Sequence, residues 1–210
     1  MATATHPGRA RQRGRCPSLV RGAFCALLVL SVAPLSAAPA IVRGVVTAKS
    51  LKKPSDIAVF LEAPGLKFTP PRGYVKIDNV TFLFIPRVLV IVPGTTVRWV
   101  NGDPEPQNVY SPEGRYNLGT LLPGEWGEHC FDEAGVYTQL CKIHPDGLGY
   151  VIVVETPYYD VTDAKGRFEI KNVAPGHYTL VAWSEELDFI EREIDVPAGG
   201  AMTVNVDFAP

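Results

Sequence analysis

The sequence predicts an all-β protein with a substantial hydrophobic core. Glycine and proline occur 19 times each in 210 residues, and the apolar runs between them are short, as in strands separated by turns. Apolar residues make up 46% of the chain and charged residues 20%, which is typical of a globular protein and argues against disorder. The length of 210 residues suits one or two domains.

The first 40 residues are predicted to be a secretory signal peptide. Five arginines come first, a largely apolar run covers residues 23–32, and the small residues S-A-A-P-A end at Ala40. The apolar run is too short to span a bilayer as a stable helix, so we expect cleavage near Ala38 or Ala40. An uncleaved anchor is the alternative. The mature chain is then expected to be secreted, in the periplasm, without a membrane span.

Removal of the signal peptide makes the chain more acidic. That segment holds five of the 20 basic residues and none of the 22 acidic ones, so the net charge moves from −2 to −7. An acidic chain lacks the basic footprint of a nucleic-acid-binding protein, and we expect no nucleic-acid partner. Cys16 and Cys25 leave with the signal, so Cys130 and Cys141 are the cysteines of the mature protein.

Strands are predicted at both ends of the mature chain. Residues 42–47 and 57–61 are two short strands, which cannot bury a core alone and need partners elsewhere. Residues 163–183 contain a hairpin and a return strand, with Gly166 where the turn needs a positive φ. Residues 202–208 alternate apolar and polar side chains, which predicts one half-buried strand. Asp160 and Asp163 are assigned to solvated turns because Lys165 would lie among the ligands of a calcium site.

The middle of the chain is also predicted to be β structure. Strands are expected at residues 75–79, 88–92, 95–100, 107–109 and 150–155, with a polar, proline-rich loop at 101–106.

The run D-E-A-G at residues 132–135 predicts a hairpin within residues 128–140. Cys130 would then face Tyr137, about 13 Å along the strand from Cys141, which is too far for a disulfide. We therefore expect Cys130 to be a buried thiol and its neighbour His129 to face outward.

Cys141 and His144 are the leading candidate metal ligands. They lie in Q-L-C-K-I-H-P-D-G-L-G-Y, residues 139–150, across a short turn between two strand-like runs. A cysteine at a strand end with a histidine just beyond it can place a sulfur and a ring nitrogen on one metal, and this pair suits copper or zinc.

The context of this motif resembles the cupredoxins, the small blue-copper proteins, over residues 72–155. The segment G-T-T-V-R-W-V-N-G-D-P-E-P-Q-N-V, residues 94–109, resembles the strand and loop of their first histidine ligand, and C-K-I-H-P resembles their second ligand loop. Y-N-L-G-T and P-G-E, between residues 116 and 125, fit the plastocyanin-like branch. The resemblance implies a Greek-key sandwich.

The resemblance also implies a copper protein with a role in one-electron transfer. Cys141 and His144 would bind copper, and Asn108 would brace the two ligand loops. The family has His where this chain has Gln107, which leaves Gln107 as a weak third ligand, and its axial Met would fall at Gly147. We expect Gln107→His together with Gly147→Met to restore a strong site. A redox partner would dock near His144, Pro145 and Leu148.

A second resemblance concerns the flanking segments. G-V-V at residues 44–46, the strand to residue 61, and residues 156–210 resemble the carboxypeptidase regulatory-like, transthyretin-like β-sandwich. The expected organisation is a signal at 1–40, the first strands of this domain at 41–71, the cupredoxin-like domain at 72–155 and the rest of the discontinuous sandwich at 156–210.

Two other function classes compete with copper binding. A metal-free binding or assembly module, which has lost its copper, would keep the same sandwiches. An enzyme is not expected, because His129, His144 and His177 are the histidines of the mature chain, and His177 is assigned to a surface turn. A G-x-S-x-G nucleophile elbow is also absent from the sequence.

Overall fold

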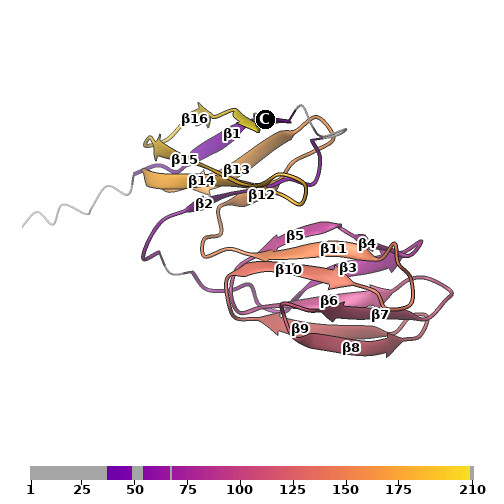
Figure 1. The fold of residues 1–210 in the computed structure, drawn as a ribbon. Helices are drawn as coiled ribbons and strands as arrows, with labels where there is room; N and C mark the ends of the chain where they lie inside the picture. The colour runs from indigo at the N-terminus through magenta and orange to yellow at the C-terminus, as the bar shows by residue number, and fades with distance from the viewer. Residues whose placement is uncertain (1–36, 49–53, 67, 209–210) are drawn as a thin grey trace, which may run out of the picture. The chain divides into compact units, whose positions relative to one another are not determined.

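The computed structural model describes residues 37–48, 54–66 and 68–208 (Figure 1). These residues form 17 strands in four sheets, with no helix among them, so the predicted all-β class is confirmed. Across the same ranges, no helix is long and apolar enough to cross a membrane. The predicted signal peptide, up to residue 36, lies outside the described residues.

The first two strands pair with strands from the C-terminal part of the chain. In one sheet, β1 (Ala40–Ala48) lies between β13 (Arg167–Val173) and β16 (Ala201–Thr203), and β17 (Val206–Phe208) also pairs with β1. The other sheet has the order β12 (Tyr159–Val161), β2 (Ala58–Glu62), β14 (Gly176–Ser184), β15 (Asp188–Val196). In Figure 1 the indigo β1 lies among orange and yellow strands. We call these two sheets the outer sandwich.

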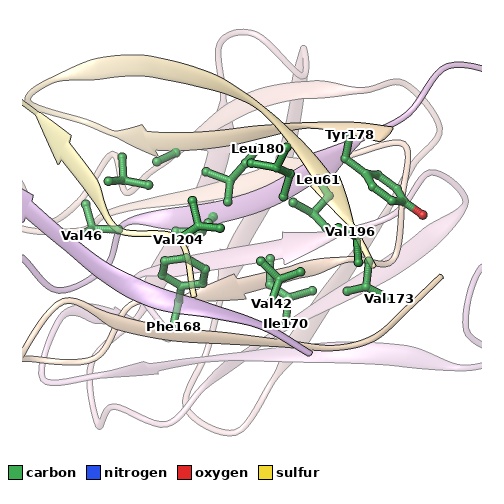
Figure 2. Close-up of a cluster of buried hydrophobic side chains, with 14 of the residues drawn as sticks. Val42, Val46, Leu61, Phe168, Ile170, Val173, Tyr178, Leu180, Val196 and Val204 are labelled. Atoms are coloured by element: carbon green, nitrogen blue, oxygen red, sulfur yellow. The ribbon is translucent and has the colours of Figure 1, made fainter. Parts of the chain in front are cut away.

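The outer sandwich has its own hydrophobic core (Figure 2). Strand alternation builds it, because successive side chains point to opposite faces of a sheet. On β13, Phe168 and Ile170 are buried while Arg167 and Glu169 are exposed. Val42 and Val46 from β1 and Leu61 from β2 are fully buried in the same cluster. The N-terminal strands therefore supply central core residues to sheets made mostly from the C-terminal part.

The predicted single strand at residues 202–208 is wrong, because it is divided into β16 and β17. Between them Val204 crosses over Gly44, where an added Cβ atom would lie 1.8 Å from the Val204 carbonyl oxygen. The Val204 amide donates to the Arg43 carbonyl, and the Val45 amide donates to the Asn205 side chain. The break lets the chain bend past β1, which requires glycine at position 44.

The middle of the chain forms two more sheets. One has the order β5 (Val88–Ile91), β11 (Leu148–Val153), β10 (Gly135–Leu140), β7 (Gln107–Ser111), β8 (Tyr116–Leu121). The other has the order β4 (Leu83–Ile85), β3 (Tyr74–Val80), β6 (Thr95–Asn101), β9 (Trp126–Phe131). Their shared core is centred on the buried Trp99 and Phe131. We call this pair the inner sandwich.

The predicted hairpin at residues 128–140 is wrong. β9 pairs with β6, whereas β10 pairs with β11 and β7, so the D-E-A-G turn joins two different sheets. Alternation from the buried Phe131 turns His129 inward and Cys130 outward, which reverses our prediction for both residues. The His129 ring stacks on the Tyr116 ring, with centroids 4.0 Å apart. Burial of His129 lowers the pKa of its imidazole.

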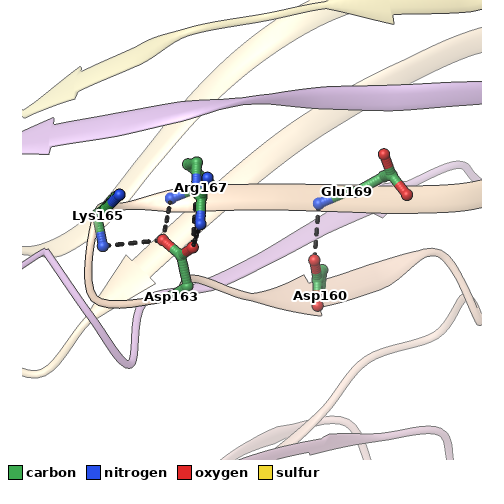
Figure 3. A network of polar contacts seen from close by, with 5 residues as sticks. All are labelled: Asp160, Asp163, Lys165, Arg167 and Glu169. Carbon is green, nitrogen blue, oxygen red and sulfur yellow. Dashed lines mark hydrogen bonds and ion pairs between the residues drawn. The ribbon is translucent and has the colours of Figure 1, made fainter.

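In the outer sandwich, the carboxylates of Asp160 and Asp163 accept hydrogen bonds from nearby groups of the protein (Figure 3). The Asp163 carboxylate accepts hydrogen bonds from the Lys165 amide and from the amide and Nε of Arg167. The Arg167 side chain lowers the pKa of Asp163 to about 2. Asp160 accepts from the Glu169 amide, and Gly166 has the predicted positive φ, at 75°. These carboxylates therefore act as turn acceptors.

The chain enters and leaves the inner sandwich beside one turn, residues 91–94. The ring of Pro70 lies beside Gly94, and the Val154 amide donates to the Ile91 carbonyl over 2.8 Å. Ile91 ends β5 and Gly94 precedes β6, so the entry and exit of this segment are held by the same turn. A further apolar cluster takes residues from β2, β14, β5 and β11, among them Phe60, Ile152 and Trp183.

We predict that residues 157–210 do not fold alone. Without β1 and β2 the fragment lacks Val42, Val46 and Leu61, and burial of each such side chain contributes about 1.5–3 kcal/mol. That loss is comparable with the whole stability of a small domain. Circular dichroism of the isolated fragment should show no cooperative thermal transition, whereas the mature chain should show one. A cooperative melt of the fragment would contradict the prediction.

We also predict that the chain is exported and that its mature form begins at Pro39 rather than at Ile41. Ala40 is 1% exposed and is part of the outer core, so cleavage after Ala40 would remove a buried residue from β1. Cleavage after Ala38 leaves the whole of β1 in place. Intact-mass measurement of the exported protein distinguishes the two products, and a mass for a chain that starts at Ile41 would contradict this prediction.

Candidate metal centre

Two loops at one end of the inner sandwich carry the predicted ligands. Gln107 is the first residue of β7, and Cys141 directly follows β10. The loop from Cys141 to β11 closes on itself, because the Cys141 amide donates to the Gly147 carbonyl over 3.0 Å and the Gly147 amide donates to the His144 carbonyl over 3.2 Å. This tight loop turns the His144 side chain back toward the end of β10.

The three predicted ligand side chains meet in the structure. Cys141 Sγ lies 3.8 Å from His144 Nδ1 and 3.5 Å from Gln107 Oε1, and His144 Nδ1 lies 3.0 Å from Gln107 Oε1. Gln107 is fully buried, Cys141 is 9% exposed and His144 is half-buried. A sulfur, a nitrogen and an oxygen therefore face one another with little access to solvent.

The thiol and the imidazole fit a shared metal ion. A thiolate at about 2.3 Å and a nitrogen at about 2.0 Å from one metal lie roughly 3.5–3.8 Å apart in tetrahedral or trigonal geometry. The observed 3.8 Å between Cys141 Sγ and His144 Nδ1 matches this range. Cys and His together suit copper or zinc by ligand softness.

The Gln107 oxygen fits a metal less well. Its 3.0 Å from His144 Nδ1 is a hydrogen-bond distance, shorter than the roughly 3.3–3.6 Å between two light atoms on one metal. The oxygen must draw back slightly to become a third ligand. Among the described residues, no cluster of three or more His, Cys, Asp or Glu ligands occurs.

The amide of Gln107 has a defined orientation. Its Nε2 donates to Asp103 Oδ2 over 2.8 Å, and Asp103 is itself 6% exposed. A carboxylate oxygen accepts hydrogen bonds and does not donate them, so the amide nitrogen must face Asp103. The amide oxygen consequently faces Cys141 and His144.

Asn108 connects three segments around the site. Its Nδ2 donates to Asn117 Oδ1 over 2.8 Å and to the Gly119 carbonyl over 2.7 Å, both on β8. Its Oδ1 accepts from the Lys142 amide over 3.4 Å, which reaches the loop directly after Cys141. The side chain thus joins β7, β8 and the second ligand loop, the geometry of a loop brace.

Gly147 has no room for a side chain. A Cβ atom added there would lie 2.6 Å from Cys141 Cβ and 3.3 Å from the His144 carbonyl oxygen. The expectation that Gly147→Met could supply an axial ligand within the present loop is therefore wrong, because a methionine would displace Cys141. The loop that carries Cys141 and His144 is closed because the backbone of Gly147 packs directly against Cys141.

The surroundings of His144 differ from the sequence-based expectation. The ring of Phe82 covers His144, with centroids 4.4 Å apart. Pro145 is exposed, and Ile143 is 46% exposed, whereas Leu148 packs against the apolar cluster shared by β5 and β11. The exposed apolar surface beside His144 is thus made by Phe82, Ile143 and Pro145, without Leu148.

Sequence reasoning missed Asp103 and Phe82. Asp103 lies in the loop assigned only as polar and proline-rich, four residues before Gln107, and Phe82 lies in a turn more than 60 residues before His144. A carboxylate four residues from a buried amide was an available signal for Asp103. No sequence pattern pairs Phe82 with His144, because their contact depends on the arrangement of the two loops.

Comparison with known proteins gives partial matches. The family described as polysaccharide lyase family 4, domain II, matches residues 155–204. A purple cupredoxin from Nitrosopumilus maritimus is 33% identical, over 38% of this chain and 98% of that one, with a TM-score of 0.35. Amicyanin from Paracoccus versutus is 28% identical, over 40% and 84%, with a TM-score of 0.34. A variant of amicyanin in its Cu(I) form is 23% identical, over 46% and 98%, with a TM-score of 0.38.

The similarity to cupredoxins extends over less than half of the chain. The match at residues 155–204 is to a family other than the transthyretin-like one, so that second resemblance stays a prediction.

We predict that Gly147→Ala destabilises the protein by about 1–3 kcal/mol, the usual cost of overpacking. The added methyl group must push Cys141 or the loop aside, because 2.6 Å is far inside van der Waals contact. Urea unfolding measures the free energy of unfolding. The control is Asp146→Ala in the same loop, where the side chain is exposed and little change is expected. Equal stabilities of the two variants would contradict the prediction.

Proposed function

We propose that this chain is an exported, periplasmic copper-binding protein that transfers single electrons and is not an enzyme. Cys141 and His144 are its main ligands and Gln107 is a weak third ligand. The observation that carries the proposal is the convergence of Cys141 Sγ, His144 Nδ1 and Gln107 Oε1 within 3.0–3.8 Å of one another. The partial similarity to cupredoxins agrees with it.

Bound copper would supply one-electron exchange between its two common oxidation states, and the chain would supply a constant environment. Cys141 is held by the backbone bond to Gly147, and Asn108 links the loops that carry the donors. Phe82 covers one face of His144 and limits the access of water. Small movement of the donors would favour rapid electron exchange.

The donor set implies weaker copper binding than a site with two histidines. An amide oxygen is a harder ligand than an imidazole and suits copper less well. The axial position of the resembling family coincides with Gly147, which has no side chain to offer. The thiolate and one imidazole would therefore contribute most of the affinity.

A redox partner would dock on the exposed apolar residues beside His144. Ile143 and Pro145 are exposed, and Phe82 is 37% exposed. Contact there would bring the partner within a few side chains of the copper ligands. Leu148 is half-buried and packs partly against the apolar cluster, so it would contribute less to this proposed surface.

A metal-free binding module is the alternative, and one observation favours it. The Oε1–Nδ1 distance of 3.0 Å is a hydrogen-bond distance, so with a proton on Nδ1 the side chains of Gln107 and His144 satisfy each other without a metal. A site of this kind could persist after copper binding had been lost. A copper titration of the mature chain separates the two functions.

The test is a copper titration of the mature chain that carries Cys130→Ser. This background removes the exposed thiol, which could bind copper itself. We expect one copper ion per chain, a thiolate charge-transfer band in the visible spectrum, and weaker binding in acid because a ligand thiol must be deprotonated. Further substitution of Cys141 by Ser should abolish the band and most of the binding.

Gln107→His is the matched gain-of-function variant. An imidazole at this position can donate an N–H hydrogen bond to Asp103 from one ring nitrogen and present its other nitrogen to the metal. The Gln107 amide does the same with its nitrogen and its oxygen. We expect copper affinity to rise by at least about tenfold, which is about 1.4 kcal/mol. If this variant is folded and remains colourless with copper, the metal-free module becomes the better description.

A further inference from the structure

A single buried carboxylate, Asp103, connects both sides of the candidate site. Its Oδ1 accepts from the Thr81 amide over 2.6 Å, and its Oδ2 accepts from the Phe82 amide over 3.0 Å and from Gln107 Nε2 over 2.8 Å. Its own amide donates to Asn101 Oδ1 over 2.9 Å. A side chain that is 6% exposed thus serves three donors from two segments.

The bond to Gln107 decides which end of the amide faces the site. With the nitrogen on Asp103, the oxygen presents lone pairs to Cys141 and His144, and only a lone pair can bind a metal. If the amide turned over, two N–H donors would face the thiol and the imidazole, and the oxygen would face a carboxylate. Asp103 therefore determines whether Gln107 can be a ligand.

The bonds to Thr81 and Phe82 hold the turn that covers His144. Both residues have a positive φ, 53° and 66°, which is unfavourable for a β-branched and a bulky residue. Such a backbone persists only where its surroundings hold it. Two hydrogen bonds to one carboxylate hold it here, and Phe82 then packs against His144 with the two rings tilted.

We propose that Asp103 is the positioning residue of this site, fixing the oxygen of Gln107 toward Cys141 and His144 and holding Phe82 over His144. As a statement about a metal site, this rests on the proposed function. Its geometric part concerns the metal-free chain. There the Gln107 oxygen can face His144 Nδ1 at 3.0 Å only if that nitrogen carries the proton.

The first arm of the test therefore needs no substitution beyond Cys130→Ser. Two-bond proton–nitrogen NMR of the metal-free mature chain, at an alkaline pH where imidazoles are neutral, reports which nitrogen of His144 is protonated. We expect the Nδ1–H tautomer. The Nε2–H tautomer would overturn the proposal, whatever the variants do.

The second arm compares Asp103→Asn with Asp103→Asn combined with Gln107→Glu. Asparagine has one acceptor where aspartate has two, so we expect Gln107 to turn over and His144 to shift toward the Nε2–H tautomer. In the double variant the asparagine amide can donate to the glutamate, whose other oxygen faces His144, and the Nδ1–H tautomer should return. A purely structural role for Asp103 would give no such return.

The third measurement is the rate at which Cys141 reacts with a disulfide reagent. In Asp103→Asn the Phe82 turn should open more readily, and we expect the rate to rise by at least about threefold. Phe82→Ala should raise the rate without changing the His144 tautomer. An Asp103→Asn protein that is folded, with an unchanged tautomer and rate, would overturn the proposal.

Copper binding separates this inference from the proposed function. If the tautomers behave as expected and no variant binds copper, Asp103 is supported as the positioning residue and the copper function fails. If the chain binds copper and Asp103→Asn leaves the tautomer and the copper affinity unchanged, the inference fails and the copper function stands.

Discussion

A fully buried amide must find partners for both of its ends, and this requirement organises the candidate site. Gln107 has an acidic acceptor on one side and two donors, or a metal, on the other. An unsatisfied polar group at such a depth costs roughly 1–3 kcal/mol. The loop that carries Asp103 and the loop that carries Cys141 and His144 must therefore stay in register with each other, and Asn108 adds a second link between β7 and the ligand loop.

Much of the fold could be predicted because its signals are local. The glycine turn predicted within residues 163–183 is present, with a positive φ at Gly166 and β13 directly after it. The errors arose where local signals do not specify partners. D-E-A-G indicates a turn but not whether its strands share a sheet, and a wrong partner for β9 reversed the faces of His129 and Cys130. Likewise, the alternation of residues 202–208 gives no sign that the chain crosses Gly44.

The site was partly predictable for a related reason. Cys141 and His144 are close in sequence, and Gln107 came from a family resemblance that fixes its position relative to them. The structure brings all three together. Asp103 and Phe82 could not be assigned in the same way, because each acts through a contact between loops. The lack of space at Gly147 was also hidden, since a loop sequence does not show how closely its backbone approaches Cys141.

The shared turn at the start and end of the inner sandwich has a consequence for the order of folding. Phe60 of β2 pairs with Tyr159 of β12, although nearly a hundred residues separate them, and closing a long flexible loop costs entropy that grows with its length. Once residues 70–154 have folded, Pro70 and Val154 are held near the turn that contains Ile91 and Gly94, and the effective loop becomes short. We therefore expect the inner sandwich to fold before β2 pairs with β12, and the sheet that contains β1 to be completed only when β13, β16 and β17 are available. A substitution that slows folding of the inner sandwich would therefore also delay assembly of the outer sandwich, even if the substituted residue makes no contact with the outer sandwich.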